Sequence, residues 1–502
     1  MTEIAPAGDR ALMVTMDDLS AEVLHAHASR LRSLDGVLAS IAGERSILVI
    51  HEPGALGVEG AIRGALASRS GEATLSARAH RIDVNFGDAY GPDLDEILAK
   101  GGLSRDAFLR GVADLRLTAR YLGFRAGFAY LDGWPDAWAL PRRPTSRVRV
   151  PGGTFAIAGT RAGFYPVDSP GGWNLLGRTD AALWDPSSDP PILIEPGDTV
   201  MIVPTEREIL ARPEPAMASV LDAPLIAEVV QPGQLTQVVS AEDWSRSVYG
   251  LPAGGPFDLE AAALANRAVG NAADAPLLEC VMVGPQLRFE RPAEVSWSGA
   301  AADLKVDGSS PADPRRFAVR AGATLAVGRI RGGLRGWLAV TGGIDVPRML
   351  YGQPPPLRRG ALYSASSRLS EAIVASLARG EIREIRAIAG PHPVSPRELD
   401  AIAANEWEVT PQIDRVGIRL RPTDRIEAEI PANLPSCGMQ CGSVQWHPDG
   451  SIIVMGPDHP VTGGYLQPVT VASEERWKLA QLAPGMLVRW RIERERLTVP
   501  TS

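Results

Sequence analysis

Thr145-Ser146-Arg147-Val148-Arg149-Val150-Pro151-Gly152-Gly153-Thr154-Phe155-Ala156-Ile157-Ala158-Gly159 contains two strand-like segments separated by a turn. The segments Thr145–Val150 and Thr154–Gly159 are short and flanked by Pro and Gly, which is typical of strands that turn tightly at their ends. A third segment of this kind, Thr199–Val203, follows later in the chain. Runs of short strands broken by turn residues predict a closed or nearly closed antiparallel sheet, so we expect a β-barrel.

Further along lies Ser169-Pro170-Gly171-Gly172-Trp173-Asn174-Leu175-Leu176-Gly177-Arg178-Thr179, which combines glycines, a large aromatic ring and an arginine. Glycine lets a ligand approach the main chain, and tryptophan offers a flat apolar face. A guanidinium group can hold a planar carboxylate with two hydrogen bonds. The segment therefore suits a pocket wall. The alternative is a tight turn with Trp173 in the core, because clustered Gly and Pro mark turns first of all.

Upstream of this barrel, residues 1–80 alternate strand and helix patterns. The predicted βαββα elements are Ala11–Thr15, Leu19–Leu34, Val37–Ile41, Ser46–His51 and Val58–Ala67. Asp17 or Asp18 is expected to cap the first helix. We therefore predict a small α/β domain. The strand pattern of Arg81–Phe86 either completes its sheet or begins the next domain.

The barrel is expected over residues 81–207, after two short helices at Asp93–Lys100 and Arg105–Ala113. Residues 208–224 then lose periodicity and contain Pro213 and Pro215. Such a composition predicts a linker between two halves of the chain.

Strand patterns resume beyond the linker. The predicted strands are Leu225–Val230, Gln286–Phe289, Glu294–Trp297, Leu325–Gly328, Leu338–Val340, Ile382–Ile388, Ile452–Met455 and Leu487–Ile492. A helix, Leu259–Val269, interrupts them, with Asp258 as its N-cap and Gly270-Asn271 as its stop. So many short strands exceed one small barrel, and we predict two β-rich domains over residues 225–365 and 366–502. The expected fold class is α+β, mostly β.

Composition excludes several classes of function. The 502 residues carry a net charge of −8, which offers no general attraction for nucleic acid or an anionic membrane. No long apolar run and no basic, apolar leader pattern occurs, so the expected location is cytoplasmic. The three cysteines, Cys280, Cys437 and Cys441, suit a reducing compartment, and no metal site is expected because the ligand set for zinc is incomplete.

Lysine usage excludes further chemistry. The chain has only Lys100, Lys305 and Lys478. None follows a glycine-rich turn as in a P-loop, and none is flanked by Met as in a biotin attachment site. No Gly-x-Ser-x-Gly segment offers a serine nucleophile. We therefore expect any catalysis to use carboxylates, arginines and backbone amides.

Several motifs resemble a known family over nearly the whole chain. The first half is similar to allophanate hydrolase subunit 1 proteins in the segments Gly8–Leu12, Arg45–Val49, Gly91–Leu94, Gly123–Leu131, Pro141–Arg143, Val150–Thr154 and Ser169–Thr179. The second half resembles subunit 2 of that family in the segments Gln231–Gly233, Ala265–Asn271, Leu278-Glu279, Leu338–Pro347, Thr462–Tyr465 and Trp477–Leu482. The chain thus resembles a natural fusion of the two.

The resemblance implies a cyclophilin-like barrel in the first half and two related barrels in the second. Homologous pairs are accessory subunits of ATP-dependent 5-oxoprolinase, and the same architecture forms the carboxyltransferase domain of urea carboxylase. The implied ligand is a small amide, urea or lactam, handled with a separate catalytic subunit, and ATP would act through that holoenzyme. The alternative is a binding or regulatory protein, because a homologous pair controls a histidine kinase in sporulating bacteria.

Candidate site residues follow from this resemblance and from the chemistry of amide activation, which needs fixed donors around a carbonyl group. The candidate substrate-binding residues are Phe128, Arg142, Arg143, Gly152, Gly153, Ser169, Gly171, Gly172, Trp173, Arg178, Thr179, Thr462 and Tyr465. Asp258 and Arg415 match the family pattern as catalytic candidates. Several of these candidates have a purely structural alternative. Asp258 could cap a helix and do nothing more, and Tyr465 could pack over a turn. Arg142 and Arg143 could be a solvated pair.

The second half departs from the family pattern at polar positions. Val239–Asp243 replaces a usual Gln-Asp-Leu-Gly-Arg, and Gly299-Ala300-Ala301 replaces Gly-Ala-Asp. Gly352–Pro356 replaces Gly-Ser-Arg-Ser-Thr, and Ser436-Cys437-Gly438 replaces Ser-Glu-Gly. A cysteine does not replace a carboxylate as a proton acceptor of similar pKa. We therefore expect that turnover in this half is reduced or lost while binding persists.

Overall fold

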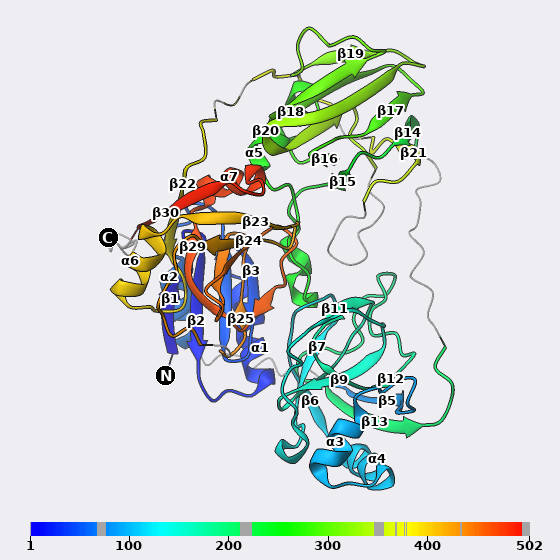
Figure 1. Cartoon of the computed structure of the whole chain (residues 1–502), viewed down its shortest axis with the longest axis vertical. Helices are drawn as coiled ribbons and strands as arrows, with labels where there is room; N and C mark the ends of the chain where they lie inside the picture. Colours follow the sequence, from blue (N-terminus) through cyan, green and yellow to red (C-terminus); the bar gives the residue numbers. More distant parts are fainter. Residues whose placement is uncertain are drawn as a thin grey trace.

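The computed structural model describes residues 2–67, 77–210, 223–345, 356–366, 369–375, 377, 379–431 and 434–493. These residues form a four-stranded sheet, two closed seven-stranded barrels, an eight-stranded sheet and two small two-stranded ribbons. Figure 1 shows the four larger units in sequence colours. The predicted fold class, mostly β with few helices, is confirmed.

The N-terminal unit is an antiparallel sheet in the order β1-β2-β4-β3. Its elements are β1 (Thr2–Pro6), β2 (Ala11–Met16), α1 (Ala21–Arg32), β3 (Val37–Ala42), β4 (Ser46–His51) and α2 (Val58–Ala67). The predicted βαββα elements are confirmed, and β1 adds a strand that the sequence pattern did not reveal.

The predicted cap of the first helix was wrong. The Ser20 hydroxyl oxygen accepts a hydrogen bond from the Val23 backbone N–H at 3.4 Å, and the helix begins at Ala21. Asp18 instead lies in the preceding turn with φ of 61°, a left-handed conformation that aspartate tolerates better than most residues. Asp and Ser are comparable caps, so the local pattern alone did not separate them.

Strand β5 (Ala79–Asn85) begins the first barrel, which settles the alternative left open for Arg81–Phe86. The other wall strands are β6 (Leu117–Leu122), β7 (Ala129–Asp132), β9 (Thr154–Ala158), β10 (Arg161–Phe164), β12 (Asn174–Arg178) and β13 (Thr199–Thr205). Helices α3 (Leu94–Gly101) and α4 (Arg105–Asp114) and the 3₁₀ turn η1 (Asp136–Trp138) connect them. β8 (Arg147–Val150) pairs with β11 (Ser169–Gly171) in a ribbon outside the wall.

The second half starts with an eight-stranded sheet that does not close into the predicted barrel. Its strands are β14 (Leu225–Gln231), β15 (Leu235–Val239), β16 (Leu277–Val281), β17 (Gln286–Phe289), β18 (Ala293–Val306), β19 (Phe317–Val319), β20 (Thr324–Val340) and β21 (Gly360–Tyr363). The 3₁₀ turn η2 (Trp244–Tyr249) and helix α5 (Leu259–Ala268) lie between β15 and β16. Asp258 caps α5 as predicted, through a 3.0 Å bond from the Ala261 N–H.

Three strand predictions in this sheet were too short. Leu325–Gly328 and Leu338–Val340 belong to one strand, β20, and Glu294–Trp297 is part of the long strand β18. Gly332 and Gly333 lie within β20, at an irregularity of its pairing with β18 between Arg331 and Gly336. Gly333 is required by close packing, because a Cβ atom there would overlap the Gln481 side chain.

The last unit is the second closed barrel. Its strands are β22 (Glu384–Ala389), β23 (Trp407–Ile413), β24 (Gly417–Pro422), β26 (Ser443–Trp446), β27 (Ile452–Met455), β29 (Leu466–Val471) and β30 (Leu487–Glu493). Helices α6 (Pro396–Ala404) and α7 (Arg476–Gln481), the 3₁₀ turn η3 (Ser473–Glu475) and a ribbon of β25 (Cys437–Gly438) and β28 (Thr462–Gly463) complete it.

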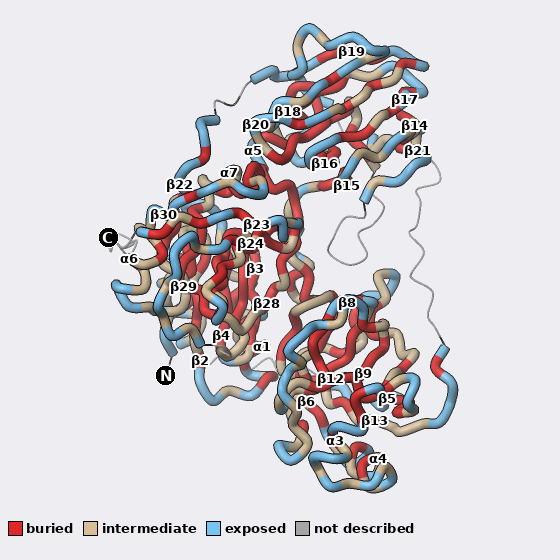
Figure 2. The backbone as a smooth tube through the Cα atoms, in the orientation of Figure 1, coloured by how far each residue is buried: buried red, intermediate tan, exposed pale blue. Residues whose placement is uncertain are grey.

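Both barrels have the same strand order. A parallel pair joins the first and last strand of each barrel, β5 with β13 and β22 with β30. The remaining neighbours correspond one to one, and each barrel carries one two-stranded ribbon at equivalent places in the chain. Figure 2 shows buried backbone along the strands of both barrels, where their cores lie.

The N-terminal sheet is buried on both faces. One face packs against its own helices through residues such as Val14 and Leu24. The opposite face, which includes Met13 and Leu48, packs against Cys437 and Val461 of the last barrel. The two ends of the described chain therefore lie side by side, as the blue and orange strands of Figure 1 show.

The predicted linker, residues 208–224, lies mostly outside the described residues. Within the described ranges, no helix is both long enough and apolar enough to cross a membrane.

Candidate functional site

Aromatic side chains fill one end of the first barrel. Phe128 and Trp173 meet edge to face with ring centroids 5.4 Å apart, and Phe128 makes similar contacts with Tyr130 and Tyr165. Trp173 is only 8% exposed, so it belongs to this buried cluster. The sequence prediction placed Phe128 and Trp173 in one site, and the structure brings them together. It did not single out Tyr130 or Tyr165, although Tyr130 lies in the same motif as Phe128.

Phe124 extends this cluster from a strained loop. Its φ is 63°, which is uncommon for a residue with a bulky side chain, and its ring packs at 5.4 Å from Phe128 and 5.9 Å from Tyr165. The surrounding structure must hold this conformation, because it costs energy on its own. The second half supplies part of that support, since the Thr462 hydroxyl donates to the Leu122 carbonyl oxygen at 3.3 Å.

The glycines of the predicted pocket wall are needed for close packing. Gly153 has φ of 81°, and a Cβ atom there would overlap the Thr179 carbonyl oxygen. A Cβ atom at Gly171 would overlap the Tyr165 hydroxyl group. The predicted backbone donors Gly152 and Gly153 already donate, to the Asp168 carboxylate at 2.8 Å and to the Tyr165 carbonyl oxygen at 2.7 Å. Neither N–H is free for a ligand in this conformation.

Ser169 and Thr179 also take part in the local turn structure. The Ser169 hydroxyl donates to the Val167 carbonyl oxygen at 3.2 Å. The Thr179 N–H donates to the Gly153 carbonyl oxygen at 2.9 Å, and its side-chain oxygen accepts from the Ala181 N–H. These contacts fix the ribbon and turns around the aromatic cluster.

Asp93, which the sequence prediction missed, anchors the arginines of this region. Its carboxylate accepts both hydrogen bonds of an Arg147 amino group at 2.7 and 2.9 Å, and one from Arg143 at 3.1 Å. It also accepts from the Leu175 N–H at 2.7 Å. The signal was weak in the sequence because Asp93 reads as an ordinary helix cap, and its partners lie 50 or more residues away.

Arg142 differs from the other predicted arginines. Arg143 is bound to Asp93, and the Arg178 Nε donates to the Gly152 carbonyl oxygen at 3.0 Å. Arg142 is exposed and makes no hydrogen bond with any residue that the structure describes. Burial raises the pKa of Tyr165 to about 12, while the Arg142 charge acts in the opposite direction. Arg142 is therefore the guanidinium group of this set that remains available to an anion.

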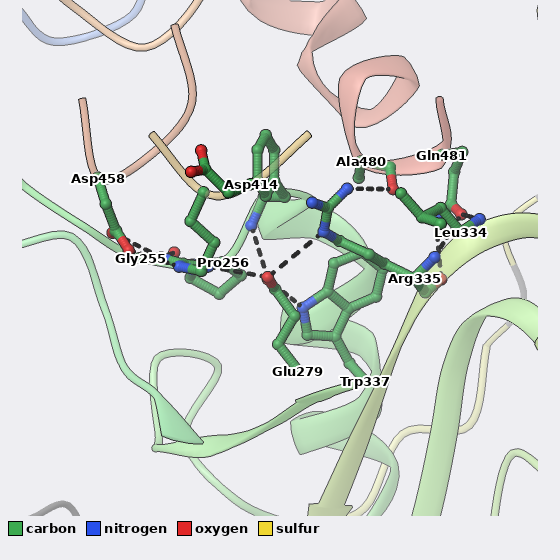
Figure 3. Close-up of polar contacts among 12 residues, drawn as sticks. Gly255, Pro256, Glu279, Leu334, Arg335, Trp337, Asp414, Asp458, Ala480 and Gln481 are labelled. Atoms are coloured by element: carbon green, nitrogen blue, oxygen red, sulfur yellow. Dashed lines mark hydrogen bonds and ion pairs between the residues drawn. The ribbon is translucent and has the colours of Figure 1, made fainter. Parts of the chain in front are cut away.

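Arg415, a predicted catalytic residue, lies in a buried ion-pair network between the two parts of the second half. Figure 3 labels Glu279, Arg335 and Asp458 of this network. Its guanidinium group donates to both oxygens of Asp458 at 2.7 and 2.9 Å and to Glu279 at 2.9 Å. The Arg415 Nη2 atom, which donates to Asp458, also donates to the Gly255 carbonyl oxygen at 2.7 Å. The side chain is only 4% exposed and its donors are occupied, so this conformation presents it to no ligand.

Glu279 is the centre of that network. It also accepts from the Phe257 N–H at 3.0 Å and the Trp337 indole at 3.2 Å, and it faces Arg335 at 3.7 Å. Burial alone would raise the pKa of Glu279, but the nearby Arg415 and Arg335 charges bring it below its usual value. Glu279 therefore stays ionised and joins β16 of the open sheet to the last barrel. Leu278-Glu279 is one of the family-like segments of the sequence, but the sequence alone assigned no role to Glu279.

The other candidates of the second half lie in separate places. Thr462 touches the first barrel, and the Tyr465 ring stacks on His447 with centroids 4.1 Å apart. Asp258 caps α5 and pairs with Arg379 at 3.3 Å. Burial raises the pKa of Asp258. The structure does not gather these residues with Trp173 and Arg142 into one constellation.

Asp258 also lines a cavity of about 1030 Å³ between the open sheet and the last barrel. Gly299, Ala300 and Ala301, where the family pattern has a carboxylate, line the same cavity. Cys437, another departure, is buried instead at the contact with the N-terminal sheet. Residues 346–355 lie outside the described ranges, so the structure does not locate most of the Gly352–Pro356 segment, which also departs from the family pattern. One position where the family pattern has a carboxylate thus lies at a cavity, and another lies at the contact with the N-terminal sheet.

Metal binding finds no support in the geometry. No group of three or more His, Cys, Asp or Glu side chains in the described residues could hold a metal ion. The Cys437 sulfur instead contacts the Gln467 amide at 3.0 Å and lies 3.9 Å from His392.

Two family models match the chain in succession. The model described as carboxyltransferase domain, subdomain C and D, matches residues 2–194, and that described as carboxyltransferase domain, subdomain A and B, matches residues 249–492. The chain is 36% identical over 184 residues to the B subunit of 5-oxoprolinase from Escherichia coli O157:H7, a match that covers 36% of this chain and 84% of the relative. The chain therefore belongs to the carboxyltransferase domain family.

Other relatives place both halves in this family. Similarity to the C subunit of 5-oxoprolinase from Escherichia coli K12 is 28% identity over 285 residues, 52% of this chain and 90% of the relative. The putative urea carboxylase of Emericella nidulans is 30% identical over 269 residues, but only 22% of its length is covered. The crystal structure of TTHA0988 superposes with a TM-score of 0.83 at 30% identity, and covers 96% of this chain and 99% of that one. The resemblance to a fusion of B-like and C-like parts is thereby confirmed.

Proposed function

We propose that this chain is a fused counterpart of the B and C subunits of 5-oxoprolinase that acts with a separate catalytic subunit on a small amide or lactam. The observation that carries the proposal is that one chain covers 84% of a 5-oxoprolinase B subunit and 90% of a 5-oxoprolinase C subunit. A covalent connection keeps two such parts at high effective concentration, which favours their acting as one unit.

Contacts between the halves support a joint role. Glu44 of the N-terminal unit pairs with Arg161 within the first half at 2.5 Å, and its backbone N–H donates across to the Ser436 carbonyl oxygen of the last barrel at 2.7 Å. Thr462 supports the loop that carries Phe124. The aromatic cluster of the first half is therefore built with help from the second.

The chemistry suits binding and positioning more than bond cleavage by this chain alone. The aromatic cluster offers apolar surface, and the Arg142 charge offers attraction for a carboxylate such as that of 5-oxoproline. ATP would be used by the partner subunit, and no lysine of this chain is a candidate for biotin attachment. A cytoplasmic location, where ATP is available, is part of this proposal.

The test is reconstitution. The purified chain is combined with a catalytic subunit of a 5-oxoprolinase, ATP and 5-oxoproline, and glutamate and ADP are measured. We expect glutamate only when all components are present. A matched sample in which separate B and C subunits replace this chain shows that the catalytic subunit is competent.

Two outcomes would change the proposal. No glutamate with a competent partner overturns it and leaves a binding or regulatory role. Carboxylation of urea from free carboxybiotin, without glutamate formation, would assign the chain to carboxyl transfer, the reaction that its family description names.

A further inference from the structure

The cavity between the open sheet and the last barrel lies away from the aromatic cluster of the first half. Its volume of about 1030 Å³ is at the upper end of the range for small-molecule sites. It is lined by β18 and β20 on one side, and by α5, α7 and residues 375, 377 and 379–382 on the others. Its described lining belongs to the second half, and the binding site proposed around the aromatic cluster and Arg142 does not include it.

The wall formed by the sheet is cationic. Arg315, Arg329 and Arg331 line it, and its other lining residues are uncharged. Arg315 and Arg331 pair with Asp313 and Asp303, but both pairs are exposed and hold these arginines only weakly. For Arg329, the structure describes no carboxylate within ion-pair distance, and its charge acts on Asp303 at longer range.

The opposite wall is apolar and aromatic. Ile382, Met486 and the Trp477 ring line it. The Arg379 guanidinium group lies 4.4 Å from the centre of the Trp477 ring and fixes its orientation. Arg379 pairs with Asp258 and Glu260, and the other acid of the lining, Glu381, pairs with Arg383 at 2.8 Å. The lining holds four arginines, Arg315, Arg329, Arg331 and Arg379, against two acids, Asp258 and Glu381, so the net charge of the lining side chains is positive.

We propose that this cavity binds an organic anion with a flat apolar or aromatic body. The acidic group faces Arg329 and Arg331, and the body lies toward Trp477. A cationic wall opposite an apolar wall selects such a molecule over a neutral one, because only the anion gains the attraction of the unpaired guanidinium group. The ligand is much larger than a lactam of a few heavy atoms, which fills a small part of this volume.

The experiment uses the full chain and the fluorescent probe 1-anilinonaphthalene-8-sulfonate. We expect saturable binding of one probe per chain that weakens as salt is added. Naphthalene-2-carboxylate should displace the probe, and the neutral naphthalene-2-carboxamide should displace it at least tenfold less well. The double variant R329Q/R331Q should weaken probe binding at least tenfold, and Trp477→Leu should weaken it severalfold.

The matched control is R316Q/R320Q. It removes two exposed, ion-paired arginines of the same part of the chain, outside the cavity, and changes the net charge equally. Equal weakening in both double variants, no effect of R329Q/R331Q, or equal displacement by the neutral amide would overturn the proposal. Thermal unfolding of each variant shows that it is folded. Glutamate formation in the reconstituted system is a separate measurement, so either proposal can fail alone.

Discussion

The two closed barrels share their strand order, yet their ribbons meet different surroundings. In the first barrel one side of the β8–β11 ribbon is open to solvent, where Val148 is 93% exposed, although Val150 and Ser169 are buried. In the last barrel the equivalent β25–β28 ribbon is covered by the N-terminal sheet, and Cys437 is 4% exposed. The ribbon of the last barrel thus forms a contact with the N-terminal sheet, whereas the ribbon of the first barrel leaves one side exposed to solvent.

Their charged groups differ in the same way. Arg415 in the last barrel is enclosed by two carboxylates, whereas Arg142 beside the first barrel is exposed. A buried pair stabilises an interface only while both partners remain, but an exposed guanidinium group can exchange water for a ligand. We therefore propose that the network around Arg415 stabilises the fold and that the region around Arg142 binds the ligand.

The largest effect is expected from Arg415→Met. Removing this guanidinium group leaves Glu279 and Asp458 buried without their main partner, which should lower the free energy of unfolding by about 3–5 kcal/mol. Denaturant unfolding measures it. Arg419→Met is the control, because the Arg419 pair with Asp449 is partly exposed and should contribute less than about 1 kcal/mol. If the variant has an unchanged free energy of unfolding but no turnover in the reconstituted reaction, Arg415 is catalytic and this prediction is wrong.

The ribbons themselves offer a matched pair of substitutions. Cys437→Arg places a large charged side chain against Leu48 and should cost about 3 kcal/mol of stability, because the site is buried and apolar. Val148→Arg, at the exposed ribbon of the other barrel, should change stability by less than about 0.5 kcal/mol. Similar effects of the two changes in thermal and denaturant unfolding would contradict the contrast between the ribbons.

Acid should weaken the last barrel through His459. Burial lowers the pKa of His459 to about 4, so the folded protein keeps this ring neutral, whereas the unfolded chain binds a proton below about pH 6.5. Stability from this group is therefore present above pH 6.5 and falls by roughly 1.4 kcal/mol per pH unit down to pH 4. His459→Gln should flatten this part of the stability profile relative to the unchanged protein, and parallel profiles would speak against it.

The smallest effect on stability is expected from Arg142→Gln, which should change the free energy of unfolding by less than about 0.5 kcal/mol. In the reconstituted reaction it should raise KM for 5-oxoproline about tenfold, because a carboxylate contact is lost. Arg110→Gln, on the exposed side of α4 in the same unit, is the control. An unchanged KM would remove Arg142 from the proposed site.

Local patterns predicted the elements that depend on neighbouring residues. Asp258 and Gly270 delimit α5 as expected, because caps act within one turn of a helix. The length of β20 was missed, because its pairing with β18 on both sides of Gly332 and Gly333 joins the two predicted segments into one strand, and this pairing is not visible in the local pattern.

The candidate site was harder to predict for the same reason. Phe128 and Trp173 were both named as substrate-binding candidates, but their contact depends on the closure of the barrel. Asp93 reaches Arg147 across 54 positions, and Glu279 reaches Arg415 across 136. Such partners carry no local signature, so a single sequence does not separate a buried structural arginine from one that binds a ligand.

The parallel pairing of β22 with β30 has a consequence for synthesis. The wall of the last barrel cannot close until Glu493 has left the ribosome, because β30 supplies the partner of its first strand. Until then the face of the N-terminal sheet that includes Met13 and Leu48 lacks its folded partner, although that sheet is made before the barrel. The sheet thus waits for a neighbour that is completed much later, and its apolar face is the place where a chaperone would be needed.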